Sequence, residues 1–235
     1  MKQSAYLIID AIIFVFALVL SLDKKPNFYK HWKGIVASLI GTTLIIGFTE
    51  VYFIDKNILT FDKQWVGTDD YFGLPVVEWL SVIAFAFAST VIYQWLKVYT
   101  GRYYKTSGNY FFIGLGLFLL VAGCLNLSHI YSSVFFLSSG ILLLLHVAIF
   151  RSKYTGTFMF AFVFIFVIFI IDRLVLARLP VSQLQEISTT SIRFYGMPLE
   201  DLVFILLLSL VDITLYESSK KLLEGRKNSS GRRRS

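Results

Sequence analysis

Cysteine and histidine are scarce in this chain of 235 residues, which holds one cysteine and three histidines. A single cysteine, Cys124, allows no disulfide within one chain and no cysteine-based metal site. His146 stands alone in an apolar run, without a second histidine at ligand spacing, so it is interpreted as a hydrogen-bonding partner in helix packing. The sequence therefore predicts no metal site.

Charged residues are also few, at 16% of the chain, and no lysine lies in the middle of an apolar run. This excludes a retinal Schiff base of the rhodopsin type. Gly114-Leu-Gly116 lacks the third glycine and the preceding strand of a dinucleotide-binding fold. No diphosphate-binding run of the DDxxD type is present either. These absences indicate no dinucleotide-binding fold.

Apolar residues dominate what remains, at 56% of the chain with a mean hydropathy of +0.69. Runs of about 20 apolar residues indicate membrane spans, and in lipid such spans must be helices because the backbone has to bond to itself. Short loops join the runs, which predicts an all-α membrane protein with one domain, residues 1–218, and seven transmembrane helices. These cover 4–22, 34–54, 75–96, 109–126, 130–150, 156–172 and 199–218.

The net charge of +7 is mainly a topology signal. Most lysines and arginines fall in the segments 23–33, 97–108 and 151–155 and in the tail 219–235. Positive charge stays on the cytoplasmic side, which predicts an external N-terminus and a cytoplasmic C-terminus. The basic tail is predicted to be disordered. Nucleic-acid binding is not supported, because no folded aromatic and basic surface accompanies the charge.

A duplication runs through the chain. Gly73-Leu-Pro75-Val-Val-Glu78 returns, 123 residues later, as Gly196-Met-Pro198-Leu-Glu200-Asp201. Upstream, residues 51–56 at the end of the second span match residues 168–173 at the end of the sixth. Spans 1–3 (repeat one, residues 1–97) and spans 5–7 (repeat two, residues 129–218) are thus predicted to form two parallel three-helix repeats. Span four, within residues 98–128, connects them.

Acidic residues mark the starts of the third and seventh spans. Pro75 and Pro198 suit the first turn of a helix and place Glu78, Glu200 and Asp201 in that turn. One acid there could simply complement the positive helix end. An equivalent acid in both repeats favours a functional role instead.

Further acids are expected at the same side of the membrane. Like charges crowded in a low dielectric cannot all ionise, and a carboxyl that keeps its proton can act as a general acid. Asp10 could join this cluster or merely face the bundle. The outer loops 55–74 and 173–197 are expected to cover it as a lid. The additional acids are Glu50 and Asp55 in the second span and Asp172 in the sixth.

Several motifs in this order resemble the membrane lycopene cyclase domain family, whose members occur as heterodimeric bacterial cyclases and as fused single chains. The similarity extends from about residue 5 to residue 218. The segments that carry it are Ser21-Leu-Asp23-Lys24-Lys25, Phe28-Tyr29-Lys30 with Trp32, residues 74–79, residues 197–201 and Tyr216-Glu217.

The resemblance implies a cyclase that converts linear carotenoid end groups to β-ionone rings without a cofactor. A protonated carboxyl would start the reaction, and a base would end it by removing a proton. It also implies a lipophilic polyene substrate, contact with membrane lipid, and a place in the bacterial cytoplasmic membrane. The implied catalytic residues are Glu78, Glu200, Asp201 and Glu50, and the implied substrate-binding residues are Pro75, Pro198, Tyr93 and Tyr216.

Repeat one departs from the family pattern at Val77, at Thr49-Glu50 and at Tyr93-Gln94. Three interpretations of these departures stay open: chemistry carried by repeat two, a different polyprenyl or terpenoid substrate, and lost activity. The rival to an enzyme is a non-catalytic seven-helix partner or a proton-coupled carrier. A carrier needs a polar path across both leaflets. Acids gathered at one side favour the enzyme.

Overall fold

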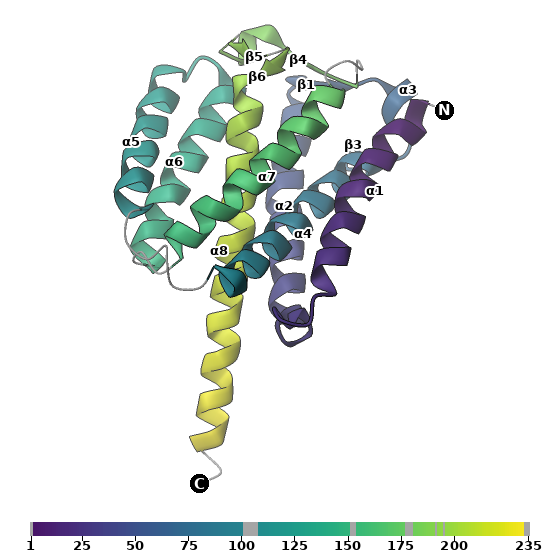
Figure 1. Ribbon diagram of the computed structural model, residues 1–235. Helices are drawn as coiled ribbons and strands as arrows, with labels where there is room; N and C mark the ends of the chain where they lie inside the picture. Colours follow the sequence, from purple (N-terminus) through teal and green to yellow (C-terminus); the bar gives the residue numbers. More distant parts are fainter. Residues whose placement is uncertain are drawn as a thin grey trace.

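The computed structural model describes residues 2–100, 108–150, 154–176, 181–190, 192–194 and 196–232, and these form a helical bundle with short strands at one end (Figure 1). We call this the hairpin end and the opposite one the tail end. Seven long helices make up the bundle: α1 (Lys2–Ser21), α2 (Trp32–Asp55), α4 (Val76–Tyr99), α5 (Gly108–Leu125), α6 (Ile130–Phe150), α7 (Thr155–Leu176) and α8 (Leu199–Arg232). The described residues also include three single turns: α3 (Lys63–Val66), η1 (Phe28–His31) and η3 (Glu186–Ser188).

Each of the seven apolar runs forms one of the long helices, so the helical prediction is confirmed. Four helices in the described residues are long and apolar enough to cross a membrane: Phe28–Asp55, Val76–Tyr99, Ile130–Ile149 and Thr155–Val175. Two further apolar helices are shorter, Tyr6–Ser21 and Asn109–Leu125. The apolar part of α8, residues 199–218, carries four acids. A crossing by all seven helices therefore stays a prediction.

The C-terminal tail differs from its prediction. Residues 219–232, predicted to be disordered, continue α8 as a helix that projects beyond the bundle (Figure 1). Leucine, lysine, arginine and glutamate are good helix formers, and an existing helix extends without a new nucleation cost. The remaining residues, 233–235, lie outside the described part of the chain.

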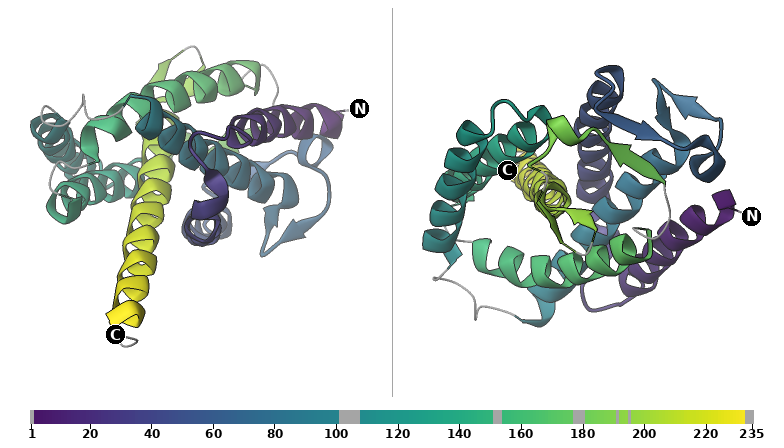
Figure 2. Two further views of the ribbon diagram at one scale, coloured as in Figure 1. Left: turned by 60° about the horizontal axis from the view of Figure 1, so that its bottom comes forward. Right: turned by 90° about the horizontal axis from the view of Figure 1, so that it is seen from above.

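Helices α4 and α8 form the centre of the bundle, and the other long helices surround them (Figure 2). Most side chains of α4 are buried, whereas large apolar side chains are exposed on α1, α2, α5, α6 and α7. An apolar outer surface of this kind suits lipid rather than water. The packing is repeated: α1 lies on α4 as α6 lies on α8, and α2 lies on α8 as α7 lies on α4.

The duplicated motif forms the same hairpin twice. Strand β2 (Asp70–Tyr71) pairs with β3 (Leu74–Pro75), and β5 (Arg193–Phe194) pairs with β6 (Met197–Pro198) in the same register. Each hairpin leads directly into a central helix, α4 or α8. Both central helices therefore run from the hairpin end to the tail end, as parallel repeats require.

A glycine makes each hairpin turn possible. Gly73 and Gly196 have φ angles of +83° and +86°, which other residues rarely adopt. Phe72, before Gly73, also has a positive φ of 59°, as a two-residue turn of type I′ requires. The repeated glycine thus has a backbone cause.

The two long loops, expected to form a lid, meet at the hairpin end through one pair of strands (Figure 2). Strand β1 (Leu59–Phe61) pairs antiparallel with β4 (Ser182–Leu184), so that Thr60 lies opposite Gln183, its own counterpart 123 residues later. Two flanking bonds are images of each other: Asp62 N to Val181 O at 3.0 Å and Gln185 N to Ile58 O at 2.9 Å. A segment that pairs with its own counterpart marks a pseudo-twofold axis.

Reciprocal hydrogen bonds also join the central helices towards the tail end. The Tyr93 hydroxyl donates to Glu217 Oε1 at 2.9 Å, and the Tyr216 hydroxyl donates to Gln94 Oε1 at 3.2 Å. Lys97 pairs with Glu217 as well. Since Tyr93 and Tyr216 are counterparts, this is one contact made twice across the same axis.

Asp23 ties the loop after α1 to the end of α4. Its Oδ2 accepts hydrogen bonds from Trp95 Nε1 at 3.0 Å and the Tyr99 hydroxyl at 2.7 Å, and its Oδ1 accepts one from Lys25 N at 3.0 Å. These bonds hold the pKa of the Asp23 carboxyl below its usual value, and the bond from the Lys25 backbone has the largest effect. The Ser21–Lys25 motif thus has a structural role.

Gly47 lets α2 approach α4 closely. A Cβ atom built at Gly47 would lie 2.1 Å from Cζ3 of Trp79, whose indole nitrogen donates to Tyr71 O at 3.3 Å. We expect Gly47→Ala to lower the free energy of unfolding by about 1–3 kcal/mol, because the pinned ring must shift. The measurement is the thermal unfolding midpoint of the purified protein in detergent.

Gly114→Ala is the matched control, because a Cβ atom there meets nothing within 4 Å. Alanine is the better helix former, so this variant should unfold at the wild-type temperature or slightly above it. Equal midpoints for the two variants would show that α2 and α4 are not in close contact at Gly47.

Candidate active site

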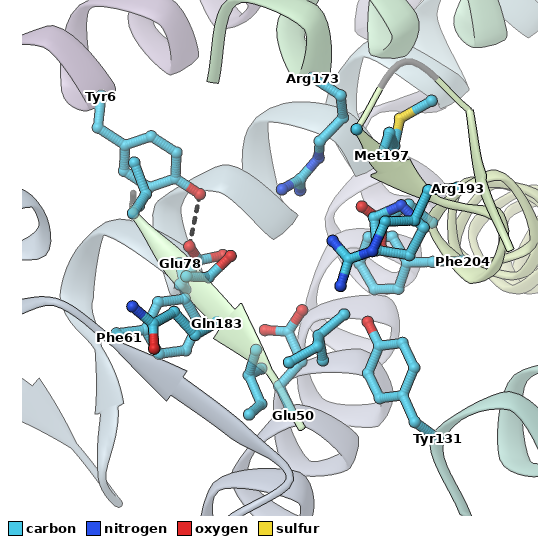
Figure 3. Close-up of a pocket in the computed structure, with 17 residues that line it drawn as sticks. Tyr6, Glu50, Phe61, Glu78, Tyr131, Arg173, Gln183, Arg193, Met197 and Phe204 are labelled. Carbon is cyan, nitrogen blue, oxygen red and sulfur yellow. Dashed lines mark hydrogen bonds between the residues drawn. The ribbon is translucent and has the colours of Figure 1, made fainter. Parts of the chain in front are cut away.

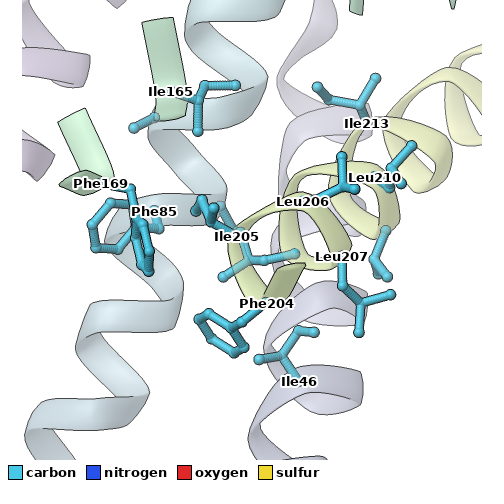
Figure 4. Close-up of a cluster of buried hydrophobic side chains, with 14 of the residues drawn as sticks. Ile46, Phe85, Ile165, Phe169, Phe204, Ile205, Leu206, Leu207, Leu210 and Ile213 are labelled. Atoms are coloured by element: carbon cyan, nitrogen blue, oxygen red, sulfur yellow. The ribbon is translucent and has the colours of Figure 1, made fainter. Parts of the chain in front are cut away.

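A cavity of about 380 Å³ lies at the hairpin end, under the paired strands β1 and β4 (Figure 3). Side chains from α1, α2, α4, α6, α7 and α8 line it together with the hairpin loops. Tightly packed apolar side chains of α2, α4, α7 and α8 form the core of the bundle, among them Ile46, Phe85, Ile165 and Ile205 (Figure 4). The cavity is therefore the place where both repeats contribute side chains to one space.

Three of the predicted acids line this cavity. Glu78 begins α4, Asp201 begins α8, and Glu50 lies one turn before the end of α2. Glu50 and Glu78 are buried, and Asp201 is half-buried. Glu78 and Asp201 are counterparts, so the pseudo-twofold axis brings one carboxyl from each repeat to the same cavity. Repeat one thus supplies two of the three groups.

Tyrosine side chains orient part of the site. The Tyr6 hydroxyl of α1 donates to Glu78 Oε1 at 2.5 Å (Figure 3). Tyr131 of α6 lines the opposite side next to Glu50. Its ring lies 4.9 Å from that of Phe53 and 4.8 Å from that of Phe135, and Phe135 in turn lies 5.5 Å from Phe204. One wall of the cavity is therefore aromatic.

Two arginines, Arg173 and Arg193, also line the cavity, although neither is among the site residues expected from the sequence. Arg193 is exposed at the rim, on β5. Arg173, near the end of α7, has a side chain 21% exposed, with Nε 3.6 Å from Asp172 Oδ2 and its guanidinium carbon 5.0 Å from the centre of the Phe169 ring. An Asp-Arg pair in an apolar helix was the available signal, since such charges are costly unless paired.

The burial pattern corrects the predicted match between the second and sixth spans. Buried positions of α2 and α7 superpose at the offset of 123 residues, namely 35, 38, 42 and 46 on 158, 161, 165 and 169. Arg173 is then the counterpart of Glu50, and Asp172 is the counterpart of Thr49 rather than of Asp55. The Asp55 side chain is 77% exposed beside Lys56. The prediction that Asp55 joins the acid cluster was wrong, because five residues along a helix turn its side chain about 140° away from that of Glu50, to the exposed face.

Glu200 does not line the cavity, although it adjoins Asp201 in the chain. It is fully buried, and its Oε1 accepts hydrogen bonds from Ser132 Oγ at 2.5 Å, Thr190 N at 2.7 Å and Thr190 Oγ1 at 2.8 Å. These bonds connect the start of α8 to α6 and to the loop after η3. Glu200 therefore holds three segments together beside the cavity.

In repeat one, apolar contacts take the place of the hydrogen bonds that Glu200 makes in repeat two. The counterpart of Glu200 is Val77, which is buried in a small cluster with Tyr6, and Ile9, the counterpart of Ser132, packs against that cluster. A hydrogen-bonded pair in repeat two thus corresponds to an apolar pair in repeat one. The departure of Val77 from the family pattern removes a structural contact rather than a cavity carboxyl.

The other predicted residues lie apart from the cavity, with one exception. Pro198 lines it, whereas Pro75 is buried in β3, and Tyr93 and Tyr216 serve the contact near the tail end. Asp10 is buried on α1 and interacts electrostatically with Asp172 and Glu78. In the described part of the chain, no group of three or more histidine, cysteine, aspartate or glutamate side chains could hold a metal ion.

Two polar residues lie deeper in the bundle. Asp212 of α8 is fully buried and accepts hydrogen bonds from Thr90 and, at 3.4 Å, from Thr42. His146 Nδ1 lies 3.1 Å from Thr214 Oγ1, which confirms its interpretation as a hydrogen-bonding partner in helix packing. Both residues join neighbouring helices to α8.

Glu200→Gln is expected to destabilise the protein by about 1–3 kcal/mol. A buried amide loses the charge of the acceptor and adds N–H donors that need partners of their own. Glu186→Gln, an exposed glutamate on η3, is the control and should unfold within about 0.5 kcal/mol of the wild type. Thermal unfolding in detergent measures both. A Glu200→Gln variant as stable as the control would contradict the structural role.

One family model matches the chain, and its description is lycopene cyclase. It matches residues 3–96 and 128–218, two segments that coincide with the two repeats and leave out the whole of the connecting helix α5. Neither a curated protein nor a solved structure matches the chain.

Proposed function

The chain belongs to the lycopene cyclase family, and from that premise we propose that it converts the linear end groups of lycopene to β-ionone rings. Membership itself indicates a carotenoid cyclase associated with the membrane and acting on a lipophilic isoprenoid. One observation carries the finer proposal: Glu50, Glu78 and Asp201 come from both repeats to one cavity with an aromatic wall. An acid, a base and an apolar surface are what this reaction needs.

The proposed reaction conserves both protons and electrons. A carboxyl O–H gives its proton to one carbon of the terminal double bond, which forms a C–H bond and leaves a tertiary cation. The electron pair of the neighbouring alkene then forms the ring-closing C–C bond and moves the cation by one step. A carboxylate removes the adjacent proton, and the double bond re-forms inside the ring. Because the product is an isomer of the substrate, the reaction consumes no reductant or oxidant.

We assign the proton transfer to Glu78 and Asp201. They are counterparts at the starts of the two central helices, so they face one cavity from opposite sides of the pseudo-twofold axis. Glu50 adds a third carboxyl from α2. Glu200 acts on Asp201 by holding the start of α8, and it is a positioning residue in this proposal. Proton transfer by one placed side chain typically contributes about 10²–10⁴-fold to a rate.

The cation would be stabilised by its surroundings. Tyr131 and Phe204 line the cavity, and the face of an aromatic ring attracts a cation. A carboxylate left after proton donation adds the opposite charge close by. Both effects act most strongly where water is excluded, which the pairing of β1 with β4 over the cavity favours.

We further propose that all seven long helices cross the membrane, with the hairpin end outside and the tail in the cytoplasm. The lysine and arginine distribution supports this orientation. The outward apolar surface of the bundle supports contact with lipid on all sides. A lycopene molecule dissolved in the bilayer would then reach the cavity from the membrane rather than from water.

A second substrate class is favoured by one observation. Arg173 and Arg193 line the cavity, and an oxygenated isoprenoid chain would hydrogen-bond to guanidinium groups, whereas a hydrocarbon would not. The same acids would cyclise such a chain by the same steps. The alternative is therefore a cyclase for a different polyprenyl or terpenoid substrate.

Expression in a lycopene-accumulating bacterium tests the proposal directly. We expect pigments with β-rings, identified by chromatography and absorption spectra. Glu78→Gln and Asp201→Asn should each lower the yield by about 10²–10⁴-fold, because each removes a group that gives or takes the proton. Asp55→Asn, an exposed acid at the same end, should leave the yield at the wild-type level.

Two outcomes would contradict this prediction. Unchanged lycopene with the wild-type chain would remove lycopene as the substrate. Wild-type yields from Glu78→Gln and Asp201→Asn would remove their roles. Yields are compared per amount of folded protein, so that a variant such as Glu200→Gln, expected to act through stability, is not mistaken for a loss of chemistry.

A further inference from the structure

Arg173 has an unusual position for an arginine in an apolar helix. It lies near the end of α7, half-buried, and its guanidinium points into the cavity (Figure 3). Asp172 pairs with it from the same helix at 3.6 Å, and Phe169 packs under it. The charged group is thus directed by its neighbours towards the carboxyls.

Charged groups on α1, α2, α4 and α8 interact with Arg173. Glu50, Glu78 and Asp201 each interact with it electrostatically, and so does Asp10 of α1. Tyr6 and Tyr131 also interact electrostatically with the Arg173 guanidinium. Arg193, exposed on the rim, is the second cation and interacts with Asp201. Arg173 is therefore the cation that all three cavity carboxyls share.

The duplication shows that this charge breaks the symmetry of the repeats. Position for position, Arg173 in repeat two corresponds to Glu50 in repeat one, and both side chains line the cavity. A symmetric pair of glutamates there would add a fourth acid to the lining, whereas the arginine supplies the opposite charge. Burying several like charges without a partner is costly. An arginine at this position therefore offsets the negative charge of the cavity carboxyls, which a second glutamate would increase.

We propose that Arg173 is a positioning residue for the cyclisation, whose permanent positive charge keeps one cavity carboxyl ionised as the base while another carboxyl holds the proton. The proposal rests on the proposed function. It follows from the chemistry, because the reaction needs a protonated acid and an ionised base in one cavity at the same pH. Three crowded carboxyls without a cation would all tend to stay protonated, and the base would be missing.

An arginine suits this role better than a lysine. The guanidinium stays charged at any pH that the protein meets, whereas a buried lysine readily loses its proton. The charge is also spread over a planar group that can face more than one carboxyl. Arg173 therefore acts as a constant field on the groups that titrate, and its effect should appear as a shift along the pH axis.

The test compares Arg173→Gln with Arg173→Lys in two measurements. Infrared spectra of the purified protein at a series of pH values follow the band of protonated carboxyls, and Glu50→Gln, Glu78→Gln and Asp201→Asn assign the contributions. Ring formation in isolated membranes supplied with lycopene gives the activity profile. Without the guanidinium the carboxyls release their protons at higher pH, so in Arg173→Gln both profiles should move up by about one pH unit. Arg173→Lys keeps the positive charge only while the lysine stays protonated, so its profiles should lie between those of the wild type and those of Arg173→Gln.

Two further variants control for net charge and for folding. Lys56→Gln removes one positive charge from an exposed position at the same end and should shift neither profile. The double variant Asp172→Asn with Arg173→Gln removes the guanidinium without leaving the Asp172 carboxylate unpaired. If the single variant Arg173→Gln fails to fold, the double variant should still fold. It should show the same upward shift of both pH profiles.

The outcomes separate this inference from the cyclase proposal. The role of Arg173 would be overturned, even if rings form, by one result. This is that the infrared and activity profiles of Arg173→Gln and of the double variant move no further than those of Lys56→Gln. An upward infrared shift in these variants together with unchanged lycopene would support the electrostatic role and overturn the substrate. A loss of stability without any pH shift would show that Arg173 only holds α7 in place.

Discussion

The burial of carboxyl groups at one end of an apolar helical bundle is the constraint on which the rest of this structure depends. A buried acid must be hydrogen-bonded, paired or protonated, because an isolated charge in such surroundings is very costly. Each acid meets this demand differently. Glu200 accepts three hydrogen bonds, Asp172 faces the Arg173 guanidinium, and Glu78 accepts the Tyr6 hydroxyl. The acids that a ligand can reach are the three that line the cavity, Glu50, Glu78 and Asp201.

The duplication builds the scaffold symmetrically and the site asymmetrically. Matching hairpins start both central helices, β1 pairs with its counterpart β4, and the two tyrosine contacts near the tail end mirror each other. Two differences between the repeats lie at or beside the cavity, where Glu200 stands in place of Val77 and Arg173 in place of Glu50. A reaction that gives a proton on one side and removes it on another needs unlike groups, which a perfectly symmetric pair of repeats would not supply.

Much of the fold could be predicted from the sequence, because long apolar runs in lipid have only the helical solution and a repeated Gly-x-Pro motif demands a repeated turn. The meeting of Glu78, Asp201 and Glu50 followed from their positions at the ends of helices. The role of Glu200 could not be predicted, since a spacing of one residue from Asp201 places the two side chains in different directions along a helix. Arg173 was missed for a related reason: a charge near the end of a span looks like a topology signal until its neighbours are known.

The sequence by itself determined the helices, their duplication and the family, because hydropathy and motif order are local properties that survive without a folded context. Only the tertiary structure decided which acids share a space. Asp55 and Glu50 are five residues apart on α2, which separates their side chains by about 140° around the helix axis. Asp55 is exposed, whereas Glu50 lines the cavity beside residues more than a hundred positions away. That division depends on which face of each helix meets its neighbours, and packing between helices sets it.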